Sequence, residues 1–416
     1  MITADTIAPA TLRRRWRVSA RQARVHAVLV ATVLWLVTMV VTFGGSGQTS
    51  LVGVLNTPDF VQFYTLGHLA DERRVTDAYD FQAFHDEQAT LVPESKSLIF
   101  PPVYPPPAAV AFIPLSRLSY ASAQRTWTAI TVILYALIVW RTWWVCRGHL
   151  PGVALVLAAA AAFPPFFQTV IYGQVTILIL APCFLAWLAL ERGQHVAAGF
   201  ALGLLAIKPQ FGPVFAVIVL MRRDWRMLWG AVGAVTLQLL GAWTLLGPDA
   251  FSGYFSVIQT VLAHADALEA KPYQSHSIRA VTRLLPGWFG LVTWLSASAI
   301  VLWKTGRVWC STAPLKVRFG LAILASVLVN PHLIVYDAAI LVLPLLWFGA
   351  EVVARGSEDV AERYGAFLYA LFLAFFIPTA AIVKVQVSVL LMLWLFWKVS
   401  TWPPAQSLAA ARTSTD

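Results

Sequence analysis

The chain has 416 residues, of which 59% are hydrophobic and only 12% are charged, and its mean hydropathy is +0.70. Soluble domains contain about 25% charged residues, so this composition excludes an ordinary soluble domain and predicts an all-α polytopic membrane protein. The net charge of +10 does not indicate nucleic-acid binding, because the basic residues are spread between apolar segments. The three cysteines are far apart and predict neither a disulfide framework nor a zinc site.

The chain begins with a basic segment, residues 1–24, followed by an apolar run over residues 25–43. This run is longer than the core of a cleavable signal peptide, so we expect a first transmembrane helix that remains in the mature protein. Further runs long enough to cross about 30 Å of hydrocarbon lie at 123–146, 151–168, 174–190, 225–246, 288–303, 316–330, 333–350, 364–379 and 381–400.

Two segments leave the number of crossings open. Residues 105–118 are short and open with three prolines, and Lys208-Pro209 divides 195–222 into two short pieces. If 105–118 is a re-entrant or interfacial outer helix and both pieces cross, 20 of the 30 basic residues and both termini lie inside. If instead 105–118 crosses and 195–222 is one span, Arg141 and Arg147 lie outside. We prefer the first arrangement, with about twelve crossings.

This arrangement predicts one transmembrane domain over residues 25–400, with cytoplasmic tails at 1–24 and 401–416. Two large outer loops, about 44–122 and 247–287, are expected to face the periplasm or the extracellular side, and the first is expected to carry short juxtamembrane helices. The turns at Gly173, Lys208 and Pro331 fall on the same outer side. We therefore expect a multi-pass membrane protein with its site facing the periplasm or the outside.

The first outer loop holds eight of the chain's twenty carboxylates. At its start, Thr57 is a good N-cap, Pro58 suits the first helical position, and Asp59 follows where the helix dipole favours an anion. Asp59 is a candidate base for this reason, although an isolated sequence of this kind more often only neutralises a helix start.

The other outer turns carry polar residues that the ends of membrane helices normally lack. A buried Lys208 requires an anion, either a structural partner such as Asp337 or a ligand phosphate. Asn330-Pro331-His332 repeats the arrangement at Thr57, and His332 shares a helix face with Tyr336. Gln174 begins another span, and the second loop contributes the polar residues Gln274, Ser275, His276 and Arg279.

Together these motifs resemble the polyprenol-phosphate-mannose-dependent mannosyltransferases of the GT-C superfamily, glycosyltransferase family 87, which includes a mycobacterial enzyme of phosphatidylinositol mannoside elongation. The resemblance covers most of the chain and rests on an ordered set of motifs: Asp59-Phe60, Tyr104 followed by three prolines, Gly173-Gln174, Lys208-Pro209-Gln210, Gln274-Ser275, and Pro331-His332 with Tyr336-Asp337. Thr176 and Tyr273 stand where the family usually has asparagine.

The resemblance implies a GT-C-type fold, a polyprenyl-phosphate sugar as donor and a lipid or glycan acceptor. It implies no metal and no other cofactor, and membrane lipids but no nucleic acid as further partners. Asp59 would be the general base of an inverting transfer, with His332 beside it. Phosphate binding is expected from Lys208, Arg279 and His276, and sugar or acceptor binding from Gln62, Tyr64, Tyr104, Gln174, Gln274, Ser275, Tyr336 and Asp337.

Three alternatives remain at this point. A related GT-C enzyme would move arabinose, glucose or an aminosugar, since such pockets differ by few contacts. A transporter of a lipid-linked sugar would show inverted repeats and charges at mid-membrane, which this sequence lacks. A membrane subunit without activity does not explain why Asp59, Lys208 and His332 all fall on one side.

Overall fold

The computed structural model describes residues 20–45, 48–264, 274–356 and 358–402. These residues form helices and connecting turns without a β-strand; two isolated bridges join Thr49 to Leu55 and Ser275 to Ile334. The all-α prediction is therefore confirmed for the described residues. Most of the predicted tails, 1–19 and 403–416, and residues 265–273 of the second outer loop lie outside them.

Each predicted apolar run coincides with a helix or a pair of helices. In chain order these are α2 (Ala20–Phe43), α7 (Tyr120–Cys146), α8 (Val153–Ala161), α9 (Pro164–Tyr172), α10 (Ile177–Glu191), α13 (Trp225–Leu246), α17 (Gly287–Trp309), α18 (Leu315–Leu328), η6 (Val335–Leu341) with α19 (Val342–Ala354), α20 (Glu358–Phe376), and α21 (Thr379–Val383) with α22 (Val387–Ser400).

Among the described residues, four helical segments are long and apolar enough to cross a membrane by themselves: Val25–Thr42, Tyr120–Cys146, Trp225–Leu246 and Val335–Ala354. The pair α8 and α9, bent by 57°, adds a fifth when counted as one span. Other apolar helices, such as α10, are shorter than the roughly 20 residues that a full crossing requires. The chain is thus a membrane protein, but the expected twelve crossings are not confirmed.

The break at Lys208-Pro209 is present and reverses the chain. Residues before it form α11 (His195–Gly203) and η3 (Leu204–Ile207), and those after it form η4 (Pro209–Phe211) and α12 (Gly212–Arg222). The ring of His195, where α11 begins, pairs with Asp224, just after α12 ends. The segment before the break therefore starts, and the segment after it ends, at one end of the molecule, while Lys208 lies at the other end. A residue before proline is restricted to extended backbone, which explains why the helix stops there.

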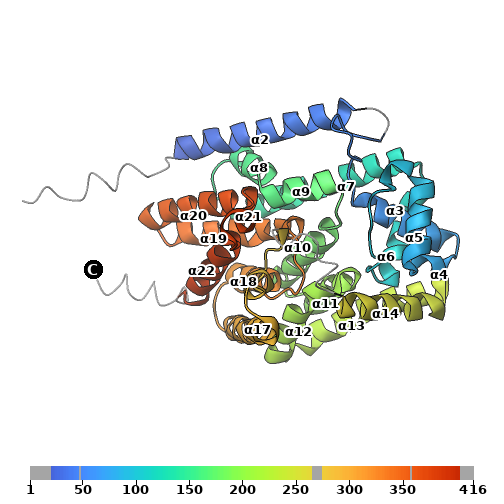
Figure 1. Cartoon of the computed structure of the whole chain (residues 1–416). Helices are drawn as coiled ribbons and strands as arrows, with labels where there is room; N and C mark the ends of the chain where they lie inside the picture. Colours follow the sequence, from blue (N-terminus) through green and yellow to red (C-terminus); the bar gives the residue numbers. More distant parts are fainter. Residues whose placement is uncertain (1–19, 46–47, 265–273, 357, 403–416) are drawn as a thin grey trace, which may run out of the picture.

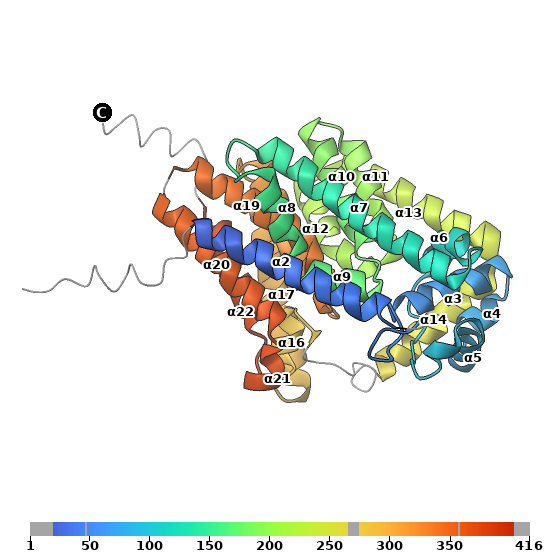
Figure 2. The same ribbon diagram turned by 90° about the horizontal axis from the view of Figure 1, so that it is seen from above.

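The first outer loop folds into a layer of short helices. It comprises α3 (Phe60–Asp71), α4 (Val75–Ala78), α5 (Phe81–Leu91), η2 (Pro93–Ser95) and α6 (Pro106–Ser116), with α14 (Pro248–Ala263) of the second loop beside them. Figures 1 and 2 show these helices gathered at one end of the long helices. α3 packs closely on α6 because Gly67 has no side chain; a Cβ there would lie 2.6 Å from the Phe112 carbonyl oxygen.

The core lies where α10, α18 and α19 meet. Trp187, Phe319 and Trp347 are fully buried there, and nearly the whole of α18 is inaccessible. By contrast, α2 and α13 expose large apolar side chains such as Leu36, Val40 and Leu237. Apolar surface on long helices is expected where lipid is the solvent, so the buried α10–α18–α19 centre forms a rigid support for the outer turns.

Candidate active site

Asp59 lies at the start of α3, but the helix begins two residues later than the sequence predicts. Asp59 is itself the N-cap, without a side-chain capping bond, and Phe60 is the first helical residue. Thr57 is not the cap: its φ is +47°, and its hydroxyl accepts a hydrogen bond of 2.7 Å from the Gln124 amide. The Asp59 carboxylate is half-buried and does not cap its own helix.

The backbone of Asp59 is fixed by α9. The Asp59 N–H donates to the Tyr172 carbonyl at 2.9 Å, at the point where α9 ends. The next residue, Gly173, has φ +71°, and a Cβ there would lie 2.7 Å from the Cβ of Phe60. Only glycine satisfies both the left-handed conformation and this approach. Gly173 therefore lets the start of α3 dock against the end of α9.

Gln174 follows at once and reaches Asp59. Its side-chain Nε2 donates to Asp59 Oδ2 at 2.5 Å, while its backbone N–H is held by the Thr169 carbonyl at 2.9 Å. Gln174 is only 1% exposed, and within the described residues its Oε1 has no hydrogen-bond partner. A buried acceptor without a partner is costly, and this one lies beside a carboxylate. The pair suits a ligand with two hydroxyl groups, one donating to the Asp59 carboxylate and the other to Gln174 Oε1.

A second carboxylate, Asp337 on η6, lies in the same end of the protein but in a different setting. Lys208 Nζ donates to Asp337 Oδ1 at 2.6 Å, and the Thr176 hydroxyl donates to the same oxygen at 3.3 Å. Lys208 is 5% exposed and Asp337 is 1% exposed. Lys208 Nζ also lies 5.5 Å from the centre of the Tyr336 ring. Of the two partners considered for Lys208, the structure shows the structural one, Asp337.

The negative charges of both carboxylates act on Tyr104, and the charge of Asp337 also acts on His332. Burial raises the pKa of the Tyr104 hydroxyl well above its usual value, and the negative charges of Asp337 and Asp59 raise it further. Surrounding protein lowers the pKa of His332, and the positive charges of Lys208 and Arg283 lower it further against the opposing effect of Asp337. His332 is thus mostly neutral near pH 7, so it offers a hydrogen bond and not a positive charge.

The second outer loop joins the site through backbone contacts. Ser275 pairs with Ile334 in an isolated bridge, and the His276 N–H donates to the Leu333 carbonyl at 2.9 Å. Ser275 is buried, and its hydroxyl has no partner among the described residues. The loop is therefore fixed beside the turn that carries His332. Tyr273, which departs from the family pattern, lies outside the described residues.

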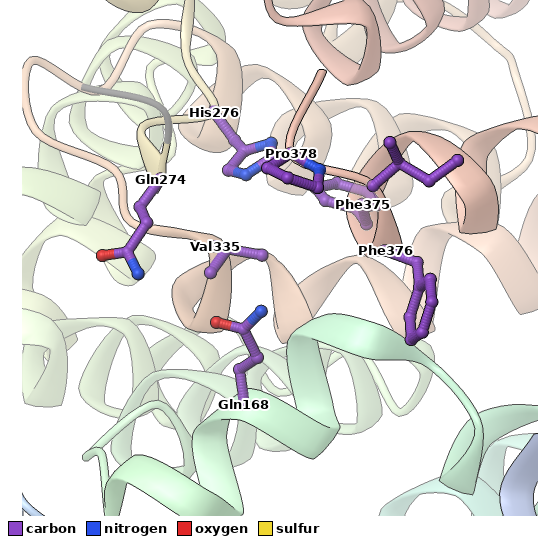
Figure 3. Close-up of a pocket in the computed structure, with 8 residues that line it drawn as sticks. Gln168, Gln274, His276, Val335, Phe375, Phe376 and Pro378 are labelled. Atoms are coloured by element: carbon purple, nitrogen blue, oxygen red, sulfur yellow. The ribbon is translucent and has the colours of Figure 1, made fainter. Parts of the chain in front are cut away.

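His276 does not fit the phosphate-binding role expected for it. Its Nδ1 lies 2.6 Å from the Ser388 hydroxyl and its Nε2 lies 3.1 Å from the Gln386 amide. Burial lowers the pKa of His276 to about 3, so the ring is neutral and supplies no cation. Figure 3 shows His276, Gln274, Gln168 and Phe375 around a small cavity. This cavity, of about 80 Å³, is where Gln274 lies.

Three other predicted residues occupy supporting or peripheral positions. The Tyr64 hydroxyl donates to the Leu118 carbonyl at 2.8 Å, so Tyr64 joins α3 to the segment after α6. Gln62 is buried within α3. Arg279, on α16 (Ile278–Thr282), lies over the Trp294 ring at 5.7 Å. Arg283, one turn further along, is the arginine that acts on His332, yet nothing in the local sequence distinguishes it from Arg279.

Fold and site together define a polytopic helical membrane protein whose outer-loop helix and span-end turns build one polar site. A family model described as glycosyltransferase family 87 matches residues 103–331, more than half of the chain. The chain belongs to glycosyltransferase family 87 and is a glycosyltransferase. The matched segment includes Tyr104, Gln174 and Lys208, whereas Asp59 precedes it and His332 follows it. Comparison with curated proteins and with solved structures gave no significant match.

Proposed function

We propose that this glycosyltransferase moves mannose from a polyprenyl-phosphate donor to a hydroxyl group of a lipid or glycan acceptor, at the outer face of the bacterial inner membrane. The observation that carries the proposal is the half-buried Asp59 carboxylate, held by Gln174 and adjoining buried hydrogen-bonding groups. Asp59 lies in the outer-loop layer that directly adjoins the long helices, where a sugar on a membrane-embedded lipid is accessible.

Asp59 acts as the general base. The acceptor hydroxyl gives its proton to the Asp59 carboxylate as its oxygen forms a bond to the anomeric carbon, and the bond from that carbon to the phosphate oxygen breaks. One carboxylate on the side opposite the leaving group is sufficient for this displacement, which inverts the anomeric centre. The Gln174 amide orients Asp59, and its free Oε1 is an acceptor for a second hydroxyl.

The leaving group is a polyprenyl phosphate, whose charge the protein must balance. Lys208 supplies a cation that Asp337 holds in position, and Arg279 and Arg283 add positive charge from the second outer loop. His332, being neutral near pH 7, contributes a hydrogen bond. Since the phosphate leaves already charged, we propose that transfer proceeds without a metal ion or another cofactor.

Specificity for the sugar rests on the buried polar groups around Asp59. Tyr104, Tyr336 and Asp337 lie on one side of the site, and Ser275 has a hydroxyl free to bond a ligand. A site built to hydrogen-bond a hydroxyl rejects a sugar that lacks it far better than an apolar pocket does. Polyprenyl phosphates that carry arabinose, glucose or an aminosugar are therefore the donors to compare with the mannose donor. Preference for one of them would change the sugar that is transferred but not the mechanism.

The test is Asp59→Asn in the purified protein, with turnover measured on polyprenyl-phosphate mannose. Asparagine is nearly isosteric but cannot accept the proton, so the rate should fall roughly 10²–10⁴-fold while donor binding and thermal stability are retained. Asp86→Asn is the matched control, because Asp86 is an exposed residue of the same layer whose carboxylate accepts a hydrogen bond from Gln82. An Asp59→Asn protein that turns over as fast as the Asp86→Asn protein would place the base elsewhere.

A further inference from the structure

A second cluster of potential ligands lies at the far end of α3. His68 belongs to the last turn of this helix, Glu72 follows it, and Glu87 reaches it from α5. His68 Nε2 lies 3.3 Å from Glu72 Oε1 and 3.5 Å from Glu87 Oε1. One atom from each of the three residues, all within 4.8 Å of one another, thus converges on a common point.

These separations match metal coordination better than hydrogen bonding. Zinc bonds of about 2.0–2.2 Å to nitrogen and oxygen, in a tetrahedron, place neighbouring ligand atoms about 3.3–3.5 Å apart. A charged hydrogen bond is closer, about 2.7–2.9 Å, as in the 2.7 Å contact of Arg117 with Asp71 on the same helix. Among the described residues, no hydrogen bond joins His68 Nε2 to either glutamate.

Arg74 fixes the orientation of both glutamates. Its Nη1 donates to Glu87 Oε2 at 2.6 Å and to Glu72 Oε2 at 3.3 Å, so each carboxylate uses one oxygen for Arg74 and presents the other toward His68. Outer hydrogen bonds of this kind align metal ligands. Asp77 also accepts from Arg74, at 2.9 Å. The three carboxylates and the one guanidinium carry a net charge of −2, which a divalent cation balances.

We propose that His68, Glu72 and Glu87 bind one Zn²⁺ ion, with water as the fourth ligand. An imidazole nitrogen with two carboxylates favours zinc over Mg²⁺ or Ca²⁺, which prefer oxygen ligands alone. Glu72 is 45% exposed and His68 is 24% exposed, so an ion and its water can enter from solvent. The ion joins the end of α3 to α5 and strengthens the outer layer.

This zinc site is separate from the transfer reaction. The twelve residues of α3 lie between Asp59 and Glu72, and at 1.5 Å per residue they span about 18 Å. The ion therefore has no contact with the sugar and supports the layer that carries the base. The inference does not depend on the donor or the acceptor, and its failure would leave the proposed function unaffected.

Isothermal titration of the full chain in detergent, purified without a polyhistidine tag, tests this site with Zn²⁺. We expect one tight ion per chain, with affinity weakened about 100-fold or more by His68→Gln, by Glu87→Gln and by the exposed Glu72→Gln. Losing an outer partner alone typically costs 10–100-fold. Asp86→Asn, next to Glu87, and His264→Gln, an exposed histidine on another helix, should bind as the wild type does.

Two further measurements complete the test. Zn²⁺ should raise the unfolding temperature of the wild type and the controls but not of the three ligand variants, and bound Co²⁺ should give the intense visible absorption of a tetrahedral site. The proposal is overturned if the wild type binds no Zn²⁺, if the ligand variants bind it equally, or if Mg²⁺ binds as tightly. The last result would mean that the carboxylates attract any divalent cation.

Discussion

The two carboxylates of the site are held in opposite ways. Asp337 is almost inaccessible and is neutralised by Lys208, a partner that is itself buried. Asp59 is half-buried and accepts from the uncharged Gln174 amide. Both lie at the same end of the protein, and both act on Tyr104. The two carboxylates therefore differ in their exposure, although they lie in one region of the protein.

From this difference we infer that Asp337 positions other residues, whereas Asp59 takes part in the chemistry. A buried charge pair is costly to form and more costly to break, so Asp337 and Lys208 hold η6 against the break between η3 and η4. The Asp59 carboxylate is half-buried, so part of it is within reach of a substrate. Proton transfer requires a carboxylate that the substrate can reach, which is why we assign the base to Asp59 and not to the inaccessible Asp337.

The largest expected effect follows from breaking the buried pair. Lys208→Met leaves Asp337 as an unpaired charge and should lower the free energy of unfolding by about 3–5 kcal/mol. Lys208→Met combined with Asp337→Asn removes both charges, so most of that stability should return. SDS titration of the purified protein measures both. Equal loss in the single and double variants would show that the charge pair is not the cause.

The double variant also tests the phosphate role of Lys208. If Lys208 contacts the donor phosphate, the double variant should bind polyprenyl phosphate at least about tenfold more weakly than Asp337→Asn alone, because a charged contact contributes about 1.5–3 kcal/mol. Donor affinity that is the same in both variants would restrict Lys208 to its structural pair with Asp337.

An intermediate effect is expected on the Asp59 side, from Gly173→Ala. The left-handed φ costs about 1–2 kcal/mol, and overlap of the new Cβ with Phe60 adds about 1–3 kcal/mol. Gly193→Ala is the matched control, because Gly193 has φ +68° but nothing lies within 4 Å of the place that a Cβ would take. The difference in unfolding free energy between the two variants isolates the close approach, and only Gly173→Ala should also lower the transfer rate. Equal stabilities would remove the packing argument.

The effect expected to be smallest near neutral pH concerns the uncharged ring of His276. Its pKa is lowered to about 3, so folded protein does not take up the proton that unfolded chain accepts below about pH 6.5. The stability contribution is complete above pH 6.5 and decreases as the pH falls toward 3, by at most about 1.4 kcal/mol per pH unit. Unfolding temperatures measured from pH 7 to pH 4.5 should decline less steeply in His276→Gln. The exposed His264→Gln should keep the wild-type slope.

The helices were predictable because their cause is local. An apolar run with proline at its start, as at Pro106, determines a membrane or buried helix by itself. The break at Lys208 was predictable for the same reason. The number of crossings was not, because α8 and α9 form a bent pair and several short apolar helices are packed among others, which composition cannot reveal.

For the candidate site, the sequence could predict which turns lie together but not which side chains pair. The structure brings Asp59, Gln174, Lys208 and Asp337 into one region, and their pairing depends on packing between residues more than one hundred positions apart. The N-cap shifted from Thr57 because Gln124 binds the threonine hydroxyl. His276 became neutral because Ser388 and Gln386, from the last helix and the residue before it, enclose it. Partners this distant in sequence cannot be predicted from the residues that neighbour Thr57 or His276.

The long sequence separations of the two pairs set an order for the making of the protein. Gln174 lies 115 residues after Asp59, and Asp337 lies 129 residues after Lys208. A chain emerging from the ribosome contains Asp59 first, Gln174 next and Lys208 after that, and Asp337 follows only in its last quarter. Until Asp337 is inserted, the nascent protein has a costly unpaired cation at the Lys208 break.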